Sequence, residues 1–374
     1  MRFGDTFYSI LKSRKMNLAE LAERSEIESA VLEGALEGEA DLTDAQVERI
    51  AEELAVPAIA LFSKSSLPLS NIPDFRRRVP SQTLFDSSII KAIGFVEKIS
   101  LSLASLGLDL SSSDALERYS GPINKRAAKK LAKKWRQRWG ISDDQQLEWK
   151  SSGEVYSSLR GYIESLGVFV LHYSFGSDVV AGLYAKVDGG PHTILINTTS
   201  SSKARKLFTL AHEFCHVLLR ADGVSNPSIL KNKIEVFCNQ FAAYLIAPDR
   251  LVSKALARYG YSVSIDNDTI RLLARNLGIS QQACILRLVD TERLLRSDYA
   301  RWMSQFSGAI PDGDRQDPGG GGGGGDPIKN KRTQFGSSFL SKLRSAQKSG
   351  LLDSIEIYRL AGIKPKYQRE LLGG

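Results

Sequence analysis

The sequence predicts an α+β fold that is predominantly helical and contains a small β-sheet. Apolar residues recur at helical spacing through most of the chain, in short blocks near the N-terminus and longer ones after residue 200. Three short runs, at 168–173, 179–185 and 193–196, are rich in β-branched and aromatic residues and are bounded by glycine and proline turns. Because these runs are few and short, we expect one small sheet among helices.

The same patterns divide the chain into four segments. Residues 1–66 hold short helical blocks and predict an all-α unit, while residues 67–306 hold the strand-like runs and predict the main domain, with a helical C-terminal part. Residues 307–326 contain a run of glycines and predict a flexible linker. Residues 327–374 are basic and helical in pattern, which predicts an appended helical module.

Composition argues against membrane and disulfide-framework proteins. No apolar run approaches the roughly 20 residues that span a bilayer, and the N-terminus has no signal-peptide pattern. The three cysteines, at positions 215, 238 and 284, are odd in number and irregular in spacing, so they predict no disulfide framework. We therefore expect a reduced, cytoplasmic protein without a membrane partner.

The most informative motif is the HExxH run at 212–216, within an apolar helical stretch. Because a helix turns about 100° per residue, His212 and His216 lie one turn apart on the same face. Two imidazoles in that arrangement can bind one Zn²⁺ ion, and Glu213 lies beside them, where it can take a proton from a metal-bound water. The motif predicts zinc as the cofactor and Glu213 as the catalytic base of a peptide hydrolysis.

A third zinc ligand is expected on a second helix. Glu235 follows His216 by nineteen residues and lies in the apolar segment 234–245, which also predicts a buried helix. An antiparallel return of that helix brings Glu235 to the metal. Asn239 lies one turn further on the same face, where it can orient a ligand. The alternative interpretation is structural, with two satisfied core histidines and a solvated glutamate.

These residues resemble the ImmA/IrrE family of metallopeptidases. The resemblance rests on 208–213 with Arg205 upstream, and on Glu235 followed by 239–243. More loosely it covers residues 75–290. The sequence departs from the family pattern at Cys215, where glycine is usual, and at Ala247, where methionine is usual. Neither position is a ligand.

The resemblance implies a zincin-like peptidase core with zinc on His212, His216 and Glu235 and Glu213 as general base. It also implies an endopeptidase that cleaves a helix-turn-helix transcriptional repressor and so derepresses stress-response or mobile-element genes. The alternative is a toxin–antitoxin component or a transcriptional regulator that uses the zinc fold mainly as a binding scaffold.

Cys215 is expected to point away from the metal. It lies about 100° around the helix from His216, so it is predicted to pack as a small hydrophobe rather than to bind zinc. A weaker alternative is that this thiol makes the site sensitive to oxidation.

The N-terminal segment resembles a helix-turn-helix domain of the XRE type, through 18–25 followed by Ile27 and Val31. Such a domain commonly precedes the peptidase in this family. However, acidic residues outnumber basic ones by seven over 1–62, and the expected recognition helix at 28–37 has three glutamates and no lysine or arginine. DNA binding is therefore possible but disfavoured, because phosphate contacts need basic groups. An interaction or autoregulatory role is expected instead, and a merely stabilising unit is the alternative.

A basic amphipathic helix is predicted at 124–139, which holds eight basic residues and no acidic one. It could contact nucleic acid, an acidic partner or the acidic N-terminal segment, or it could be a solvated face. The edge of the predicted sheet could pair with an extended substrate. Four residues are candidates for polarising the scissile carbonyl, although each is more often structural: His172, His192, Tyr184 and Tyr244.

Overall fold

The protein is described here from a computed structural model. It describes residues 6–14, 16–39, 41–56, 58–62, 87–149, 151–176, 180–187, 189–199, 202–220, 223–225, 233–258, 266–305 and 326–373. The predicted linker at 307–326 lies outside these residues except for its last position.

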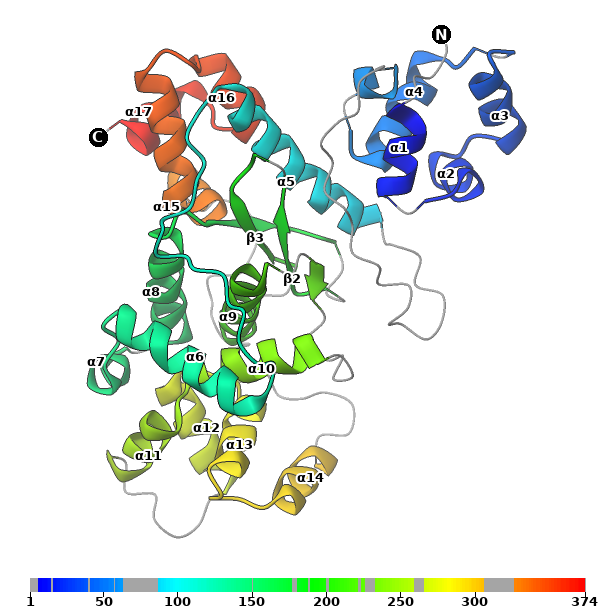
Figure 1. The fold of residues 1–374 in the computed structure, drawn as a ribbon. Helices are drawn as coiled ribbons and strands as arrows, with labels where there is room; N and C mark the ends of the chain where they lie inside the picture. Colours follow the sequence, from blue (N-terminus) through cyan, green and yellow to red (C-terminus); the bar gives the residue numbers. More distant parts are fainter. Residues whose placement is uncertain are drawn as a thin grey trace.

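Seventeen α-helices, one 3-10 helix and four strands make up the described chain (Figure 1). In order they are α1(Thr6–Ser13), α2(Leu18–Ser25), α3(Ser29–Glu37), α4(Asp44–Leu54), η1(Ala58–Phe62), α5(Ser87–Ser105), α6(Lys125–Arg138), α7(Asp143–Glu148), α8(Ser152–Glu164), β1(Phe169–Tyr173), β2(Gly182–Lys186), β3(His192–Asn197), α9(Lys203–Leu219), β4(Gly223–Ser225), α10(Lys233–Ile246), α11(Asp249–Arg258), α12(Asn267–Leu277), α13(Gln281–Asp290), α14(Arg296–Ser304), α15(Pro327–Lys348), α16(Ser354–Ala361) and α17(Pro365–Leu372). The predicted class, α+β and predominantly helical, is confirmed.

The strands form one sheet in the order β1-β3-β2-β4. β1 runs parallel to β3, with Val170 opposite Ile194, whereas β2 runs antiparallel to both β3 and β4. The three predicted strands are present, and β2 begins three residues later than expected. β4 was not predicted, because three residues are too few to show an alternating pattern.

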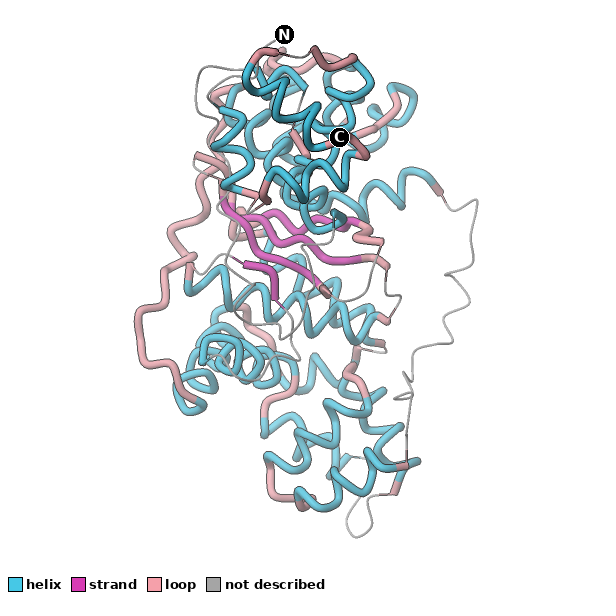
Figure 2. The backbone as a smooth tube through the Cα atoms, turned by 90° about the vertical axis from the view of Figure 1, so that its right-hand side faces the viewer, coloured by secondary structure: helices cyan, strands magenta, loops and turns pink. Residues whose placement is uncertain are grey.

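Helices cover both faces of the sheet (Figure 2). Even-numbered apolar residues of the three longer strands, such as Tyr184 and Ile194, belong to a core with α6, α8, α9 and α10. Odd-numbered ones, such as Leu183 and Leu195, belong to a second core with α5 and α15 to α17. Successive side chains of a strand point to opposite faces of the sheet. Because both faces of this sheet are buried, its strands need the continuous apolar runs seen in the sequence.

The C-terminal helices pack on the sheet. Phe335 and Phe339 of α15 are buried in the same core as Phe169 of β1, and the rings of Phe169 and Phe339 meet edge to face at 5.6 Å. The sequence did not predict whether this segment packs on the main domain. An apolar helix face shows that something covers it, but not which surface does.

α15 is bent where it crosses α8. Gly336 has φ 70° and ψ 175°, outside the helical region. Glu164 of α8 accepts a hydrogen bond from the Ser337 N–H at 2.8 Å, and Arg160 donates to the Thr333 carbonyl at 2.7 Å and to Glu164 at 2.8 Å. The Arg160–Glu164 pair therefore satisfies the backbone groups that the bend exposes.

The N-terminal helices have their own core and are fastened to α5 by a buried ion pair. Ile90 of α5 joins the apolar cluster formed by α1 to α4 and η1. Arg14, which is fully buried, donates to Glu97 Oε1 at 2.9 Å and to the Leu54 carbonyl at 2.9 Å. A buried guanidinium needs this degree of pairing, because burial removes its hydration.

The predicted basic helix is α6, and several of its cations are paired locally. Its apolar stripe packs on α10. Lys125 pairs with Asp290 at 2.8 Å, Lys134 with Glu117 at 2.9 Å, and Lys129 with Asp249. These partners lie outside the acidic N-terminal segment. Among the described residues, no helix combines the length and apolar character that crossing a membrane requires.

Candidate metal centre

Helix α9 carries the HExxH motif inside the core that it forms with α6, α8, α10 and one face of the sheet. Its first turn is capped by the side chain of Ser202, which accepts a hydrogen bond from the Arg205 N–H at 3.3 Å. It ends at Arg220, which adopts a left-handed conformation and donates to the Leu116 carbonyl at 2.8 Å. From Thr209 to Leu218 every residue is buried, so the motif lies away from bulk water.

Helix α10 brings a carboxylate to the two histidines. The Nε2 atoms of His212 and His216 lie 3.1 Å apart, and the Glu235 carboxylate oxygens lie 3.2 Å from His212 Nε2 and 3.5 Å from His216 Nε2. One donor atom from each of the three residues lies within 4.8 Å of the others, and all three side chains are buried. The structure thus brings together the three residues predicted as ligands.

Two of the three residues hold the protonation state that a cation needs. Burial lowers the pKa of His212, which favours its neutral ring. Burial alone would raise the pKa of Glu235, but hydrogen bonds with His212 and His216 outweigh it and bring that pKa to about 2. Glu235 is therefore ionised at neutral pH and brings a negative charge to the cluster. Burial would lower the pKa of His216, but its contacts with Cys238 and Glu235 outweigh burial and raise that pKa well above its usual value.

Glu213 lies between α9 and the sheet, next to Gly182 of β2. A Cβ placed on Gly182 would lie 2.6 Å from Thr209 Cγ2, 2.9 Å from the Leu195 carbonyl oxygen and 3.6 Å from Glu213 Cγ. The missing side chain therefore allows α9 to approach β2 closely, and the approach places the buried Glu213 carboxylate on the sheet side of the helix. Gly182 could not be singled out from the sequence, because its importance depends on a contact with a distant helix.

Two further side chains surround the cluster. Asn239 hydrogen-bonds with His212 and partly opposes the lowering of the His212 pKa by burial, so it lies beside that residue as predicted. Cys238 of α10 contacts both His216 and Cys215, and burial raises the pKa of its thiol well above the usual value. Cys215 itself is fully buried in the apolar core. Cys238, and not the Cys215 singled out from the motif, is the thiol that contacts a histidine of the cluster.

The donor set fits a metal ion. Two imidazole nitrogens lie 3.1 Å apart, and each has a different oxygen of the Glu235 carboxylate within 3.5 Å. Two histidines and one glutamate are a common ligand set for a catalytic zinc with an open position. The fit rests on three chemically suitable atoms that lie together in a buried place.

The four candidates for carbonyl polarisation have other contacts. His172 Nε2 hydrogen-bonds with the hydroxyl of Tyr156, and His192 Nδ1 hydrogen-bonds with the hydroxyl of Tyr184 at 2.6 Å. The ring of Tyr244 lies under the Arg287 guanidinium at 4.5 Å. Each of these side chains therefore has a partner within the protein.

A buried His-His-Glu cluster with an adjacent glutamate, on two helices beside a small sheet, is the arrangement of a metallopeptidase domain. Residues 163–289 match the family model of the IrrE N-terminal-like domain. This part of the chain, which includes both helices of the cluster, is therefore similar to the metallopeptidase domain of the ImmA/IrrE family.

A similar curated protein is the radiation response metalloprotease IrrE of Deinococcus deserti, which is 32% identical over 107 residues. The alignment covers 26% of this chain and 36% of that protein, so the chain matches about a third of the relative's length.

Proposed function

We propose that this protein is a zinc-dependent endopeptidase whose ion is held by His212, His216 and Glu235. The observation that carries the proposal is the convergence of their donor atoms within 4.8 Å in a buried cluster. The ImmA/IrrE domain supports it, since its matched residues include both helices of the cluster. When bound, the ion would supply a Lewis acid for the peptide carbonyl and lower the pKa of a water molecule.

Glu213 is the residue of this chain that moves the proton. It follows the first histidine directly, and the close approach of α9 to β2 at Gly182 fixes its position. Glu213 takes the proton of the attacking water and delivers it to the leaving amine. Its burial removes competing water from that carboxylate.

The strand β4 is the proposed place for the peptide substrate. It is an edge of the sheet, pairs with β2 through Tyr184 opposite Gly223, and follows α9 after three residues. The other edge, β1, packs against α15. An extended peptide paired with β4 would receive main-chain hydrogen bonds and lie beside the helix that carries the motif.

The proposed substrate is a helix-turn-helix transcriptional repressor. The support is the family resemblance, and cleavage of such a repressor would derepress the genes that it controls. The acidic helical unit formed by α1 to α4 is proposed to recognise a protein rather than DNA, because α3 carries glutamates and no basic residue.

The test combines metal analysis with cleavage. The wild type and Glu213→Gln are expected to contain one zinc per chain by elemental analysis, whereas His212→Ala and Glu235→Ala lose it. A panel of helix-turn-helix repressors is incubated with each protein, and the products are measured by intact mass spectrometry. The wild type is expected to cleave, and Glu213→Gln is expected to cleave at least about 100-fold more slowly. The two variants that lose zinc are expected not to cleave.

The same variants distinguish the binding-scaffold alternative. A scaffold keeps its partner and its regulatory effect in Glu213→Gln, because the glutamine preserves the shape of the site. Full regulatory effect of Glu213→Gln in cells would therefore overturn proteolysis as the function.

A further inference from the structure

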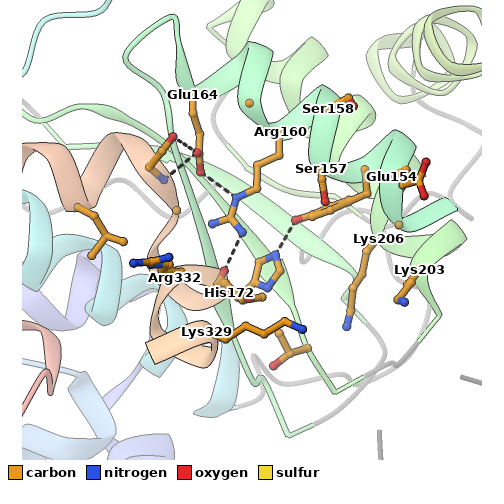
Figure 3. A pocket seen from close by; sticks show the side chains of 18 of the residues that line it. Glu154, Ser157, Ser158, Arg160, Glu164, His172, Lys203, Lys206, Lys329 and Arg332 are labelled. Atoms are coloured by element: carbon orange, nitrogen blue, oxygen red, sulfur yellow. Dashed lines mark hydrogen bonds and ion pairs between the residues drawn. The ribbon is translucent and has the colours of Figure 1, made fainter. Parts of the chain in front are cut away.

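A cavity lies beside β1, at the edge of the sheet opposite β4. It has a volume of about 1410 Å³ and is bounded by α8, the start of α9, β1 and α15. Figure 3 shows its lining, with Arg160 and Glu164 on one wall and the lysines of α9 on the opposite one. None of the three cluster residues is among its lining residues. Lys206 precedes His212 by six residues, which is about 9 Å along α9.

The cavity carries an excess of positive charge. Its cationic lining residues are Lys203, Lys206, Arg160, Lys329, Arg332 and Arg344, against the carboxylates of Glu154 and Glu164. The Glu164 carboxylate already accepts hydrogen bonds from Arg160 and from the backbone of α15. The remaining carboxylate, Glu154, is exposed, and the lining holds five cations besides Arg160.

Several of these cations lack an anionic partner. Within the part of the chain that the structure describes, Lys206, Lys329 and Arg344 form no ion pair, and the buried Nε of Arg344 has no hydrogen-bond partner. Burial lowers the pKa of Lys206, and the like charge of Lys203 lowers it further. Cations brought together in this way repel one another, so a bound anion would be stabilised by all of them.

The cations approach the cavity from two separate elements. Lys203 and Lys206 extend from the first turn of α9, and Lys329 extends across from α15 toward them (Figure 3). α9 begins at Lys203, so the positive end of its dipole lies on the same side. A ligand with several negative charges could contact α9 and α15 together, which one isolated surface charge would not allow.

We propose that this cavity binds a small phosphorylated ligand with two or more phosphates, such as a nucleoside polyphosphate. Lysine and arginine are the side chains that bind phosphate best. The volume exceeds the roughly 300–1,000 Å³ of most small-molecule sites, so a nucleotide fits. The aromatic rings of Trp149 and Tyr156 also line the cavity and can contact a base. The cations line one cavity, and Lys206 and Arg344 are partly buried in it, which favours a small ligand over a nucleic acid.

The arrangement also suggests what binding does. A ligand held by Lys206 and Lys329 joins the helix of the metal centre to the C-terminal helices. Since the cavity does not include the metal cluster, this binding does not depend on the proposed peptidase activity.

Calorimetry on the full chain, with inorganic pyrophosphate, triphosphate and ATP as probes, tests the proposal. We expect binding to the wild type and a loss of affinity of at least about tenfold in Lys206→Ala/Lys329→Ala, because each substitution removes a charge-assisted hydrogen bond to a phosphate. The matched control is Lys130→Ala/Lys133→Ala, which removes two exposed cations of α6 outside the cavity. His212→Ala keeps the affinity if the phosphates do not bind at the metal cluster.

Tighter binding of ATP than of triphosphate would identify a nucleotide, and equal affinity would identify the phosphate chain itself as the ligand. The proposal is overturned if no probe binds at millimolar concentration, or if the control pair weakens binding as much as the cavity pair. It is also overturned if His212→Ala abolishes binding, or if a duplex RNA binds more tightly with the same dependence on Lys206 and Lys329.

Discussion

Single residues set the distance between α9 and the sheet. Gly182 faces Thr209 and Glu213, and any side chain there would meet atoms at 2.6 and 2.9 Å. Real Cβ contacts are longer, so a larger residue must move either the helix or the strand. The position of the proposed catalytic carboxylate, Glu213, therefore depends on a residue that has no chemistry of its own.

Gly182→Ala is expected to weaken both stability and activity. The added methyl group should lower the free energy of unfolding by about 1–3 kcal/mol. A displaced Glu213 should lower kcat/KM by about 10- to 100-fold. Chemical denaturation and peptidase assays measure the two effects. The control is Gly161→Ala in α8, where a Cβ meets nothing within 4 Å. Equal behaviour of the two variants would contradict the steric explanation.

Two buried histidines outside the metal centre should make stability depend on pH. Burial lowers the pKa of His172 to about 3 and that of His192 to about 3, whereas an unfolded histidine titrates near 6.5. Between these values the unfolded chain binds protons that the folded chain does not, so the free energy of unfolding falls as pH falls below about 6.5. The expected slope is up to about 1.4 kcal/mol per pH unit for each histidine.

His172→Gln tests that slope. Denaturant unfolding of wild type and variant is compared between pH 7 and pH 5, a range in which most carboxylates stay ionised. We expect a shallower pH dependence in the variant, by up to about 1.4 kcal/mol per pH unit below pH 6.5. Parallel curves for the two proteins would show that His172 is not held neutral.

At the scale of elements, helix spacing was enough to predict which residues form the candidate metal site. His212 and His216 had to share a face once α9 formed, and Glu235 needed only an antiparallel α10. The partners of the other elements could not be predicted. Cys238 touches His216, and Glu164 supports the bend of α15, through contacts between residues far apart in the chain. Such contacts depend on packing, which a local pattern does not encode.

The bend of α15 at Gly336 can be tested by comparing its alanine variant with that of Gly350, which follows the helix. Gly336 and Gly350 both have φ 70°, but a Cβ on Gly336 would lie 1.8 Å from the Glu164 carboxylate, whereas one on Gly350 meets nothing within 4 Å. Gly350→Ala should cost about 1 kcal/mol of stability from the backbone alone, and Gly336→Ala about 2–4 kcal/mol. Equilibrium denaturation measures both. If the two losses were equal, the α8–α15 contact would contribute little.

For the whole molecule, the Arg14–Glu97 pair ties the N-terminal helices to the rest. The two side chains are 0% and 3% exposed. Glu97→Ala leaves a buried guanidinium without its carboxylate, so we expect a loss of about 3–5 kcal/mol. Limited proteolysis after residue 62 and denaturation of the full chain detect the release of this unit.

An exposed ion pair at the same junction is the control for Glu97. Lys91 pairs with Glu52 at 3.0 Å, and both are partly or largely exposed. Lys91→Ala should therefore change stability by less than about 1 kcal/mol. A comparable loss from both variants would mean that burial of the Arg14–Glu97 pair has no special role.

The sequence by itself determined the helical character, the three longer strands and the residues of the metal cluster, because each depends on spacing along one element. Only the tertiary structure decided that the C-terminal helices cover the sheet, that Gly182 lets α9 approach β2, and that lysines from α9 and α15 face one cavity. The physical reason is that these features arise where surfaces meet. An apolar or charged face can be read from the chain, but the surface that it meets is chosen by the packing of the whole molecule.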